Sequence, residues 1–152
     1  MVTLVYADAS YDKKSQKAGL AVVIMRHNHG EKPVHQHFKK LEEAQDSNMA
    51  ELQAVLYGVE QLNEADENII IMTDNKNVKQ TIKRPNREEY KGARSEIGLK
   101  IRQILDNSPN RAYRIYHIKG HTGFKGIHYE NQQWCDEKAR NTLRKSRFHN
   151  RE

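Results

Sequence analysis

The order of strand-like and helical segments is the strongest constraint on how this chain can fold. Three apolar β-type segments come first, and strands then alternate with amphipathic helical stretches. The expected strands cover residues 2–9, 19–26, 34–41, 68–73 and 112–118, and the expected helices cover residues 49–62, 75–83, 97–105 and 130–147. Consecutive strands favour an antiparallel meander, and helical crossovers join parallel strands. The predicted class is therefore α/β, with a mixed five-stranded sheet flanked by helices and the segment at 34–41 near a sheet edge.

The length and charge of the chain limit its organisation and its partners. A chain of 152 residues fits one domain, which we expect over residues 1–147, with residues 148–152 as a frayed polar tail. Lysine and arginine total 26 against 20 aspartates and glutamates, a formal charge of +6. This excess favours a polyanionic partner such as nucleic acid, although it is also compatible with a merely cationic surface.

Cysteine content and hydropathy indicate the cellular setting. With Cys135 as the single cysteine, no internal disulfide can form, and a reducing cytoplasmic setting is expected. No apolar run approaches the ~20 residues of a membrane helix, so no membrane association is expected. The first residues also lack the basic and apolar regions of a signal peptide.

Four carboxylates stand where a metal site would need them. Asp8 and Asp74 each close an apolar strand, and Glu51 and Asp136 each flank the apolar stripe of a helix. If the two strands are parallel neighbours, their carboxyl ends meet at one rim of the sheet, where α/β proteins bind ligands. Unpaired carboxylates so close would resist joint ionisation, and a divalent cation removes that penalty. Oxygen-only ligation favours Mg²⁺ or Mn²⁺ over zinc.

Each carboxylate also has a purely structural interpretation. Asp8 could be a turn former. Asp74 could cap the following helix, and Glu51 could take part in a capping box at the start of its own helix. Asp136 could be a surface residue that pairs with Arg140 one turn later. These alternatives explain the residues one at a time, but they do not explain why all four are placed to converge.

Five short motifs, in order along the chain, extend the pattern beyond the carboxylates. They are Asp8-Ala9-Ser10, Asn48-Met49-Ala50-Glu51, Thr73-Asp74-Asn75, Lys119-Gly120-His121-Thr122-Gly123 and Cys135-Asp136-Glu137-Lys138-Ala139. In this order and spacing the chain resembles the type 1 ribonuclease H family, whose members cut RNA in RNA–DNA hybrids. The family has a ribonuclease H-like fold, a mixed five-stranded sheet flanked by helices, in agreement with the order of segments.

The resemblance implies a function and a set of site residues. It implies a metal-dependent endonuclease that hydrolyses the RNA strand by a two-metal mechanism and leaves 5′-phosphate and 3′-hydroxyl ends. The implied cofactors are two Mg²⁺ ions, with Mn²⁺ as a possible substitute, and the implied partner is an RNA–DNA hybrid bound by a monomer. The implied catalytic residues are Asp8, Glu51, Asp74, His121 and Asp136, of which the four carboxylates are the metal ligands.

Further residues are candidates for contact with nucleic acid. They are Ser47, Asn48, Asn75, Lys76, Lys119 and Asn131. The region 76–102 is basic but lacks tryptophan, so it is either a substrate grip or a solvated charged surface. The 15 positions from His121 to Asp136 exceed the number expected for well-known bacterial members. Because the first strand begins at residue 2, no separate hybrid-binding module is expected.

Two other classes of protein remain open. One is a non-catalytic nucleic-acid-binding domain of the same fold, which the presence of all four carboxylates disfavours. The other is a transposon- or recombinase-type phosphoryl-transfer nuclease, which the Lys-Gly-His-Thr-Gly motif at 119–123 fits less well than a ribonuclease. Primer removal, R-loop clearance and service to a phage or mobile element are equally compatible with the sequence.

Overall fold

Five strands form one mixed sheet in the computed structural model, which describes residues 1–27, 33–118 and 127–149. The strands are β1 (Val2–Asp12), β2 (Lys17–His27), β3 (Val34–Leu41), β4 (Asn68–Thr73) and β5 (Ala112–His117). Their order across the sheet is β3-β2-β1-β4-β5. β1, β2 and β3 pair antiparallel, whereas β4 is parallel to both β1 and β5. The predicted fold class and the edge position of β3 are confirmed.

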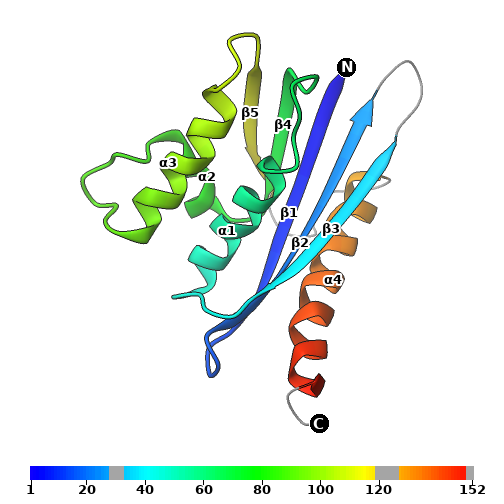
Figure 1. Ribbon diagram of the computed structural model, residues 1–152, viewed down its shortest axis with the longest axis vertical. Coiled ribbons are helices and arrows are strands. Elements are labelled where there is room, and N and C mark those ends of the chain that lie inside the picture. Colours follow the sequence, from blue (N-terminus) through cyan, green and yellow to red (C-terminus); the bar gives the residue numbers. More distant parts are fainter. Residues whose placement is uncertain (28–32, 119–126, 150–152) are drawn as a thin grey trace.

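Helices cover both faces of this sheet. They are α1 (Ser47–Val59), α2 (Lys76–Lys83), α3 (Ala93–Asp106) and α4 (Ile127–His149). In Figure 1, α1, α2 and α3 lie on one side of the sheet and α4 lies on the other. Within the described residues, no helix is long and apolar enough to cross a membrane.

Strand β1 has apolar side chains on both faces, as its sequence predicts. Val5 and Ala7 belong to the core under α1 and α3, and Leu4 and Tyr6 belong to the core under α4. This follows from the alternation of side chains along a strand. The central strand is therefore fixed by packing against helices from both layers.

Several element boundaries differ from the prediction. β1 continues to Asp12 because its antiparallel pairing with β2 extends to Asp12↔Lys17, although the last residues of β1 are polar. α1 ends at Val59, before the predicted end at residue 62. α4 begins at Ile127 and continues to His149, past the predicted end at residue 147.

A buried ion pair ties the sheet together at the start of β4. The Asp66 carboxylate is fully buried and accepts two hydrogen bonds from the Arg26 guanidinium, at 2.8 and 2.9 Å. It also accepts hydrogen bonds from the Thr3 hydroxyl at 2.6 Å and from the Asn63 backbone N–H at 2.9 Å. These contacts connect β1, β2 and the turn before β4, at the end of β4 opposite to Asp74.

Helix α4 lies very close to β2 at Gly19. A Cβ atom at this position would lie 2.1 Å from the carbonyl oxygen of Ala139 and 3.0 Å from the backbone nitrogen of Leu143. Both are backbone atoms of a helix, so they cannot move aside individually. The absence of a side chain at Gly19 therefore sets how near α4 lies to the sheet.

We expect Gly19→Ala to lower the free energy of unfolding by about 1–3 kcal/mol, because the added methyl group displaces α4 as a whole. Urea denaturation followed by circular dichroism measures this change. Gly58→Ala is the comparison variant, because its Cβ would meet side-chain methyl groups of Val5 and Val22, the nearest at 2.9 Å, and not helix backbone. Equal unfolding midpoints for wild type and Gly19→Ala would contradict the expectation.

Candidate metal centre

Asp8 and Asp74 occupy equivalent positions on neighbouring parallel strands. The β1–β4 pairing ends at Tyr6↔Met72, and each aspartate lies two residues beyond that pair. β4 then ends at Thr73, whereas β1 continues beside β2. The sheet therefore opens beyond β4, and the two carboxylates lie at the rim of this opening.

Glu51 reaches the same rim from α1. The helix is capped by Asp46, whose carboxylate accepts a hydrogen bond from the Met49 N–H at 2.8 Å. Glu51 therefore forms no capping box. Its Oε1 accepts a hydrogen bond from the Ala9 backbone N–H at 3.2 Å, beyond the last β1–β4 pair. Its Oε2 is buried and has no hydrogen-bond partner among the described residues.

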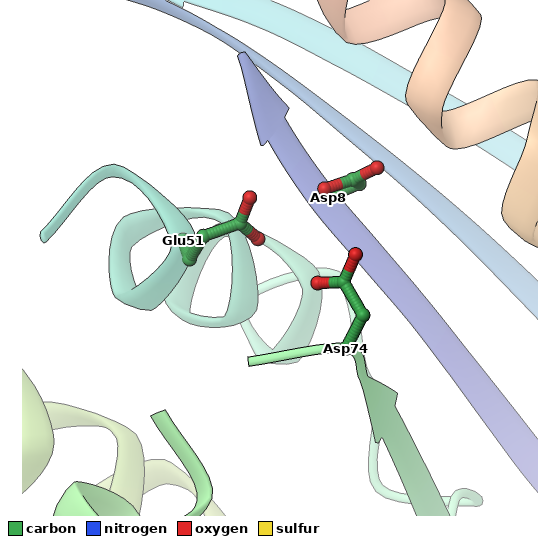
Figure 2. A group of neighbouring side chains, drawn as sticks. All are labelled: Asp8, Glu51 and Asp74. Atoms are coloured by element: carbon green, nitrogen blue, oxygen red, sulfur yellow. The ribbon is translucent and has the colours of Figure 1, made fainter. Parts of the chain in front are cut away.

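The three carboxylates form one group, as Figure 2 shows. One oxygen from each of Asp8, Glu51 and Asp74 lies within 4.8 Å of the others. Asp8 is buried, Glu51 is partly buried and Asp74 is exposed, so the group opens toward solvent on the Asp74 side. Asp74 does not cap α2, because the Asn75 side chain accepts the hydrogen bonds from the Asn77 and Val78 N–H groups.

Asp136 lies near this group but outside it. It is on α4, on the opposite face of the sheet from α1, and its charge contributes to the raised pKa of Asp8. Its Oδ2 accepts a hydrogen bond from Arg140 at 3.0 Å, the pairing that the structural interpretation predicts. The side chains of this pair are 35% and 51% exposed. Exposed pairs of this kind contribute roughly 0–1 kcal/mol, so Asp136 can exchange its partner at little cost.

The electrostatics of the three carboxylates suit a divalent cation. Burial and the charge of Asp74 raise the pKa of Asp8 to about 7. Burial and the charge of Asp8 raise the pKa of Glu51 well above its usual range. Joint ionisation is therefore unfavourable until a cation neutralises the group. The all-oxygen donor set and the buried Glu51 Oε2 without a partner fit Mg²⁺ or Mn²⁺.

Four of the polar residues predicted to contact nucleic acid lie at the starts of α1 and α2. Ser47, Asn48 and Lys76 are exposed at the start of α1 and α2, and Asn75 is partly exposed between them. The Asn75 amide donates a hydrogen bond to Asn48 Oδ1 at 2.8 Å, which connects the two helix starts beside Asp74.

Asn131 lies in the interior of the protein. It is 7% exposed, on the face of α4 that packs on the sheet, and its amide donates to Met25 Sδ at 3.7 Å. This interior position contrasts with the surface position expected of a nucleic-acid contact, which stays a prediction for this residue. The predicted residues His121 and Lys119 lie outside the described residues.

Two contacts at the rim were not predicted from the sequence. The backbone N–H of Ala9 holds Glu51, as described above, and His117 Nε2 lies 3.1 Å from the backbone oxygen of Asp74. A carbonyl oxygen only accepts, so Nε2 carries the hydrogen of this bond. The parallel pairing of β4 and β5 is the signal that could have indicated this contact. Its last pair is Thr73↔His117, which places His117 next to Asp74.

The family model for RNase H matches residues 1–144, and the chain belongs to the RNase H family. Comparison with curated proteins finds no match.

Solved structures of RNase H proteins share the fold. The prototype foamy virus protease-reverse transcriptase is 22% identical with a TM-score of 0.72; the match covers 92% of this chain, which spans only 20% of that protein. The separate PFV RNase H domain is 21% identical, with a TM-score of 0.70 and coverage of 93% of this chain and 92% of the domain. LC11-RNase H1 in complex with an RNA/DNA hybrid is 18% identical, with a TM-score of 0.69 and coverage of 95% and 98%.

Proposed function

We propose that this protein is an endoribonuclease that hydrolyses the RNA strand of RNA–DNA hybrids with the help of divalent metal ions. The observation that carries the proposal is the convergence of Asp8, Glu51 and Asp74 at one rim of the sheet in a chain of the RNase H family. The similarity to LC11-RNase H1, which was solved with an RNA/DNA hybrid, supports the choice of substrate.

The carboxylates would hold two Mg²⁺ ions, for which Mn²⁺ can substitute. Asp8 lies between the α1 layer and the α4 layer and is the candidate ligand for both ions, with Glu51 and Asp74 on one side and Asp136 on the other. When bound, such ions activate a water for in-line attack on phosphate and stabilise the leaving 3′ oxygen, which leaves 5′-phosphate and 3′-hydroxyl ends.

The protein itself supplies the geometry and the proton transfer. Ala9 N–H and His117 hold Glu51 and Asp74 in place through their hydrogen bonds. Asp136 completes the ligand set once its exposed pairing with Arg140 opens. We assign to His121 the movement of a proton on the side of the attacking water, a task that suits an imidazole near neutral pH.

Substrate recognition would combine backbone charge with contacts to ribose. Ser47, Asn48 and Asn75 lie beside the three carboxylates and offer donors and acceptors for the 2′-hydroxyl groups that distinguish RNA from DNA. Lys76 and the other lysine and arginine side chains of the region 76–102 would contact phosphates. A cavity of about 530 Å³ between α2 and α3 carries four of these cations, Lys83, Arg84, Arg87 and Arg102. Such contacts depend on salt but not on sequence.

Cleavage of end-labelled duplexes tests this function. The wild type, with Mg²⁺ or Mn²⁺, should cut the RNA strand of a hybrid and leave duplex RNA and duplex DNA intact, and EDTA should stop the reaction. Asp74→Asn should be inactive on the hybrid. Hybrid binding without cleavage would indicate a non-catalytic domain, and cleavage of duplex DNA would indicate a recombinase-type nuclease; either result contradicts the proposal.

Glu51→Gln separates the metal role of this residue from its role in the helix. Glutamine keeps an oxygen that can accept from Ala9 N–H but removes the negative charge, so we expect hybrid cleavage to fall by about a hundredfold or more while α1 stays folded. Glu60→Gln is the matched control, since Glu60 is an exposed carboxylate at the other end of the same helix. Equal single-turnover rates for the two variants would rule out the metal role of Glu51.

A further inference from the structure

Tyr6 connects strand β1 to helix α4 by its side chain and by its backbone. Its side chain is fully buried, and its hydroxyl is hydrogen-bonded to Nδ1 of His128. Burial raises the pKa of Tyr6 to about 12, and the nearby Asn131 side chain offsets part of that rise. Its backbone oxygen accepts a hydrogen bond from the Cys135 thiol at 3.7 Å. Tyr6 thus contacts three residues of α4.

The direction of the hydrogen bond at the hydroxyl follows from the groups involved. A neutral imidazole that carries its hydrogen on Nε2 offers Nδ1 as an acceptor, and the Tyr6 hydroxyl is then the donor. The contact therefore requires both the hydroxyl of Tyr6 and an acceptor at the position of Nδ1, and each can be removed separately.

The spacing of these residues explains what the contacts fix. Positions 128, 131 and 135 follow the three- and four-residue steps of one helix face. They meet a single residue of β1, so α4 can neither slide along the strand nor rotate without breaking a contact with Tyr6. Asp136 directly follows Cys135, and Asp8 lies two residues after Tyr6. The same contacts therefore set the separation of Asp8 and Asp136.

We propose that Tyr6 is a positioning residue that, through its hydroxyl bond to His128, holds α4 so that Asp136 lies beside Asp8 as a metal ligand. The proposal rests on the metal-dependent function described above. It assigns to a fully buried tyrosine and to a histidine outside the predicted site a role in metal affinity, in addition to their packing.

Direct measurement of Mn²⁺ binding by calorimetry tests the proposal without reference to cleavage. Tyr6→Phe removes the hydroxyl and keeps the ring, and His128→Leu removes the acceptor together with the ring contact to Tyr6. Each should weaken Mn²⁺ affinity by about tenfold, the usual effect of losing a residue that orients a ligand. The double variant should be no weaker than either single variant, because both break the same bond.

Two matched variants separate positioning from general destabilisation. His128→Asn places Oδ1 near the position of Nδ1 and keeps an acceptor, so its Mn²⁺ affinity should stay within about twofold of wild type. Tyr116→Phe removes a hydroxyl from a tyrosine that is 44% exposed on β5 and should bind Mn²⁺ like wild type. Thermal unfolding of all variants confirms that they are folded at the temperature of the titration.

The outcomes separate this proposal from the nuclease function. If Tyr6→Phe binds Mn²⁺ like wild type and only loses thermal stability, its role is packing and the proposal is overturned. Losses that multiply in the double variant overturn it as well, and so does a wild type that binds no Mn²⁺. If wild type binds Mn²⁺, the variants bind it more weakly and no hybrid is cut, the positioning role stands and the nuclease function fails.

Discussion

Asp8→Asn should abolish hybrid cleavage and, at the same time, stabilise the metal-free protein. Asp8 is the most buried member of the three-carboxylate group, and the charge of Asp74 adds to the cost of ionising it. Asparagine keeps the shape of the side chain but removes the charge. We expect cleavage to fall by about a thousandfold or more, because the candidate ligand shared by both ions is lost.

The gain in stability depends on pH in a defined direction. A carboxyl whose native pKa is raised to about 7 favours the folded state most below its unfolded-state pKa and loses that contribution as the pH rises through 7. The metal-free wild type should therefore lose stability between about pH 4 and pH 7, and Asp8→Asn should lose less. At pH 8 the variant should be more stable by on the order of 2 kcal/mol, a rise in Tm of about 5 °C.

Thermal unfolding in EDTA at pH 5 and pH 8 measures this effect. Added Mg²⁺ or Mn²⁺ should raise the Tm of the wild type at pH 8 and leave that of Asp8→Asn nearly unchanged, since ligands stabilise only the state that binds them. Glu60→Gln should behave like wild type in all conditions. A metal-free Asp8→Asn variant that unfolds below the wild type at pH 8 would be incompatible with repulsion in the carboxylate group.

Asp66→Asn should cause a large loss of stability without touching the candidate metal centre. Asp66 is fully buried, and its substitution leaves the Arg26 guanidinium, 15% exposed, without a counter-charge. Breaking a buried ion pair from one side costs about 3–5 kcal/mol. Although burial alone would raise the pKa of Asp66, the hydrogen bonds from Arg26, Asn63 and Thr3 lower it below its usual value.

Urea denaturation at pH 7 and pH 3 tests both parts of this expectation. A lowered pKa means that the contribution of Asp66 is complete above the unfolded-state value of about 3.9 and is lost as the pH falls through the native pKa. The difference between wild type and Asp66→Asn should therefore shrink at pH 3. Glu89→Gln is the control, since its pairing with Arg87 is exposed and should contribute less than about 1 kcal/mol. A difference at pH 7 as small as that of the control would refute the expectation.

The sequence predicted the fold because its signals are local and consistent. Apolar runs, helical periodicity and the order of segments were enough for the mixed sheet, and the exposed polar residues of β3 indicated an edge. The ends of elements depended on pairing instead. Ser10 and Asp12 are strand residues only because β2 lies opposite them, and no local pattern indicates that.

The candidate site was predicted less completely, for a similar reason. The ends of apolar runs predicted that Asp8 and Asp74 belong to a site, and their equivalent register explains why they meet. The sequence alone does not distinguish a metal ligand from a helix cap. In the structure, Asp46 and Asn75 take the capping roles that Glu51 and Asp74 could have taken. The burial of Asn131 was not predicted, because periodicity at the start of α4 did not show which face would be buried.

The candidate metal centre draws on both layers of helices and on two strands that are far apart in the sequence. Asp8 and Asp74 require the parallel β1–β4 pairing, Glu51 requires α1, and Asp136 requires α4 on the opposite face. During synthesis, therefore, a growing chain would hold an incomplete ligand set until residue 136 had left the ribosome and α4 had docked. The hybrid cleavage proposed for this protein would begin only after that docking step.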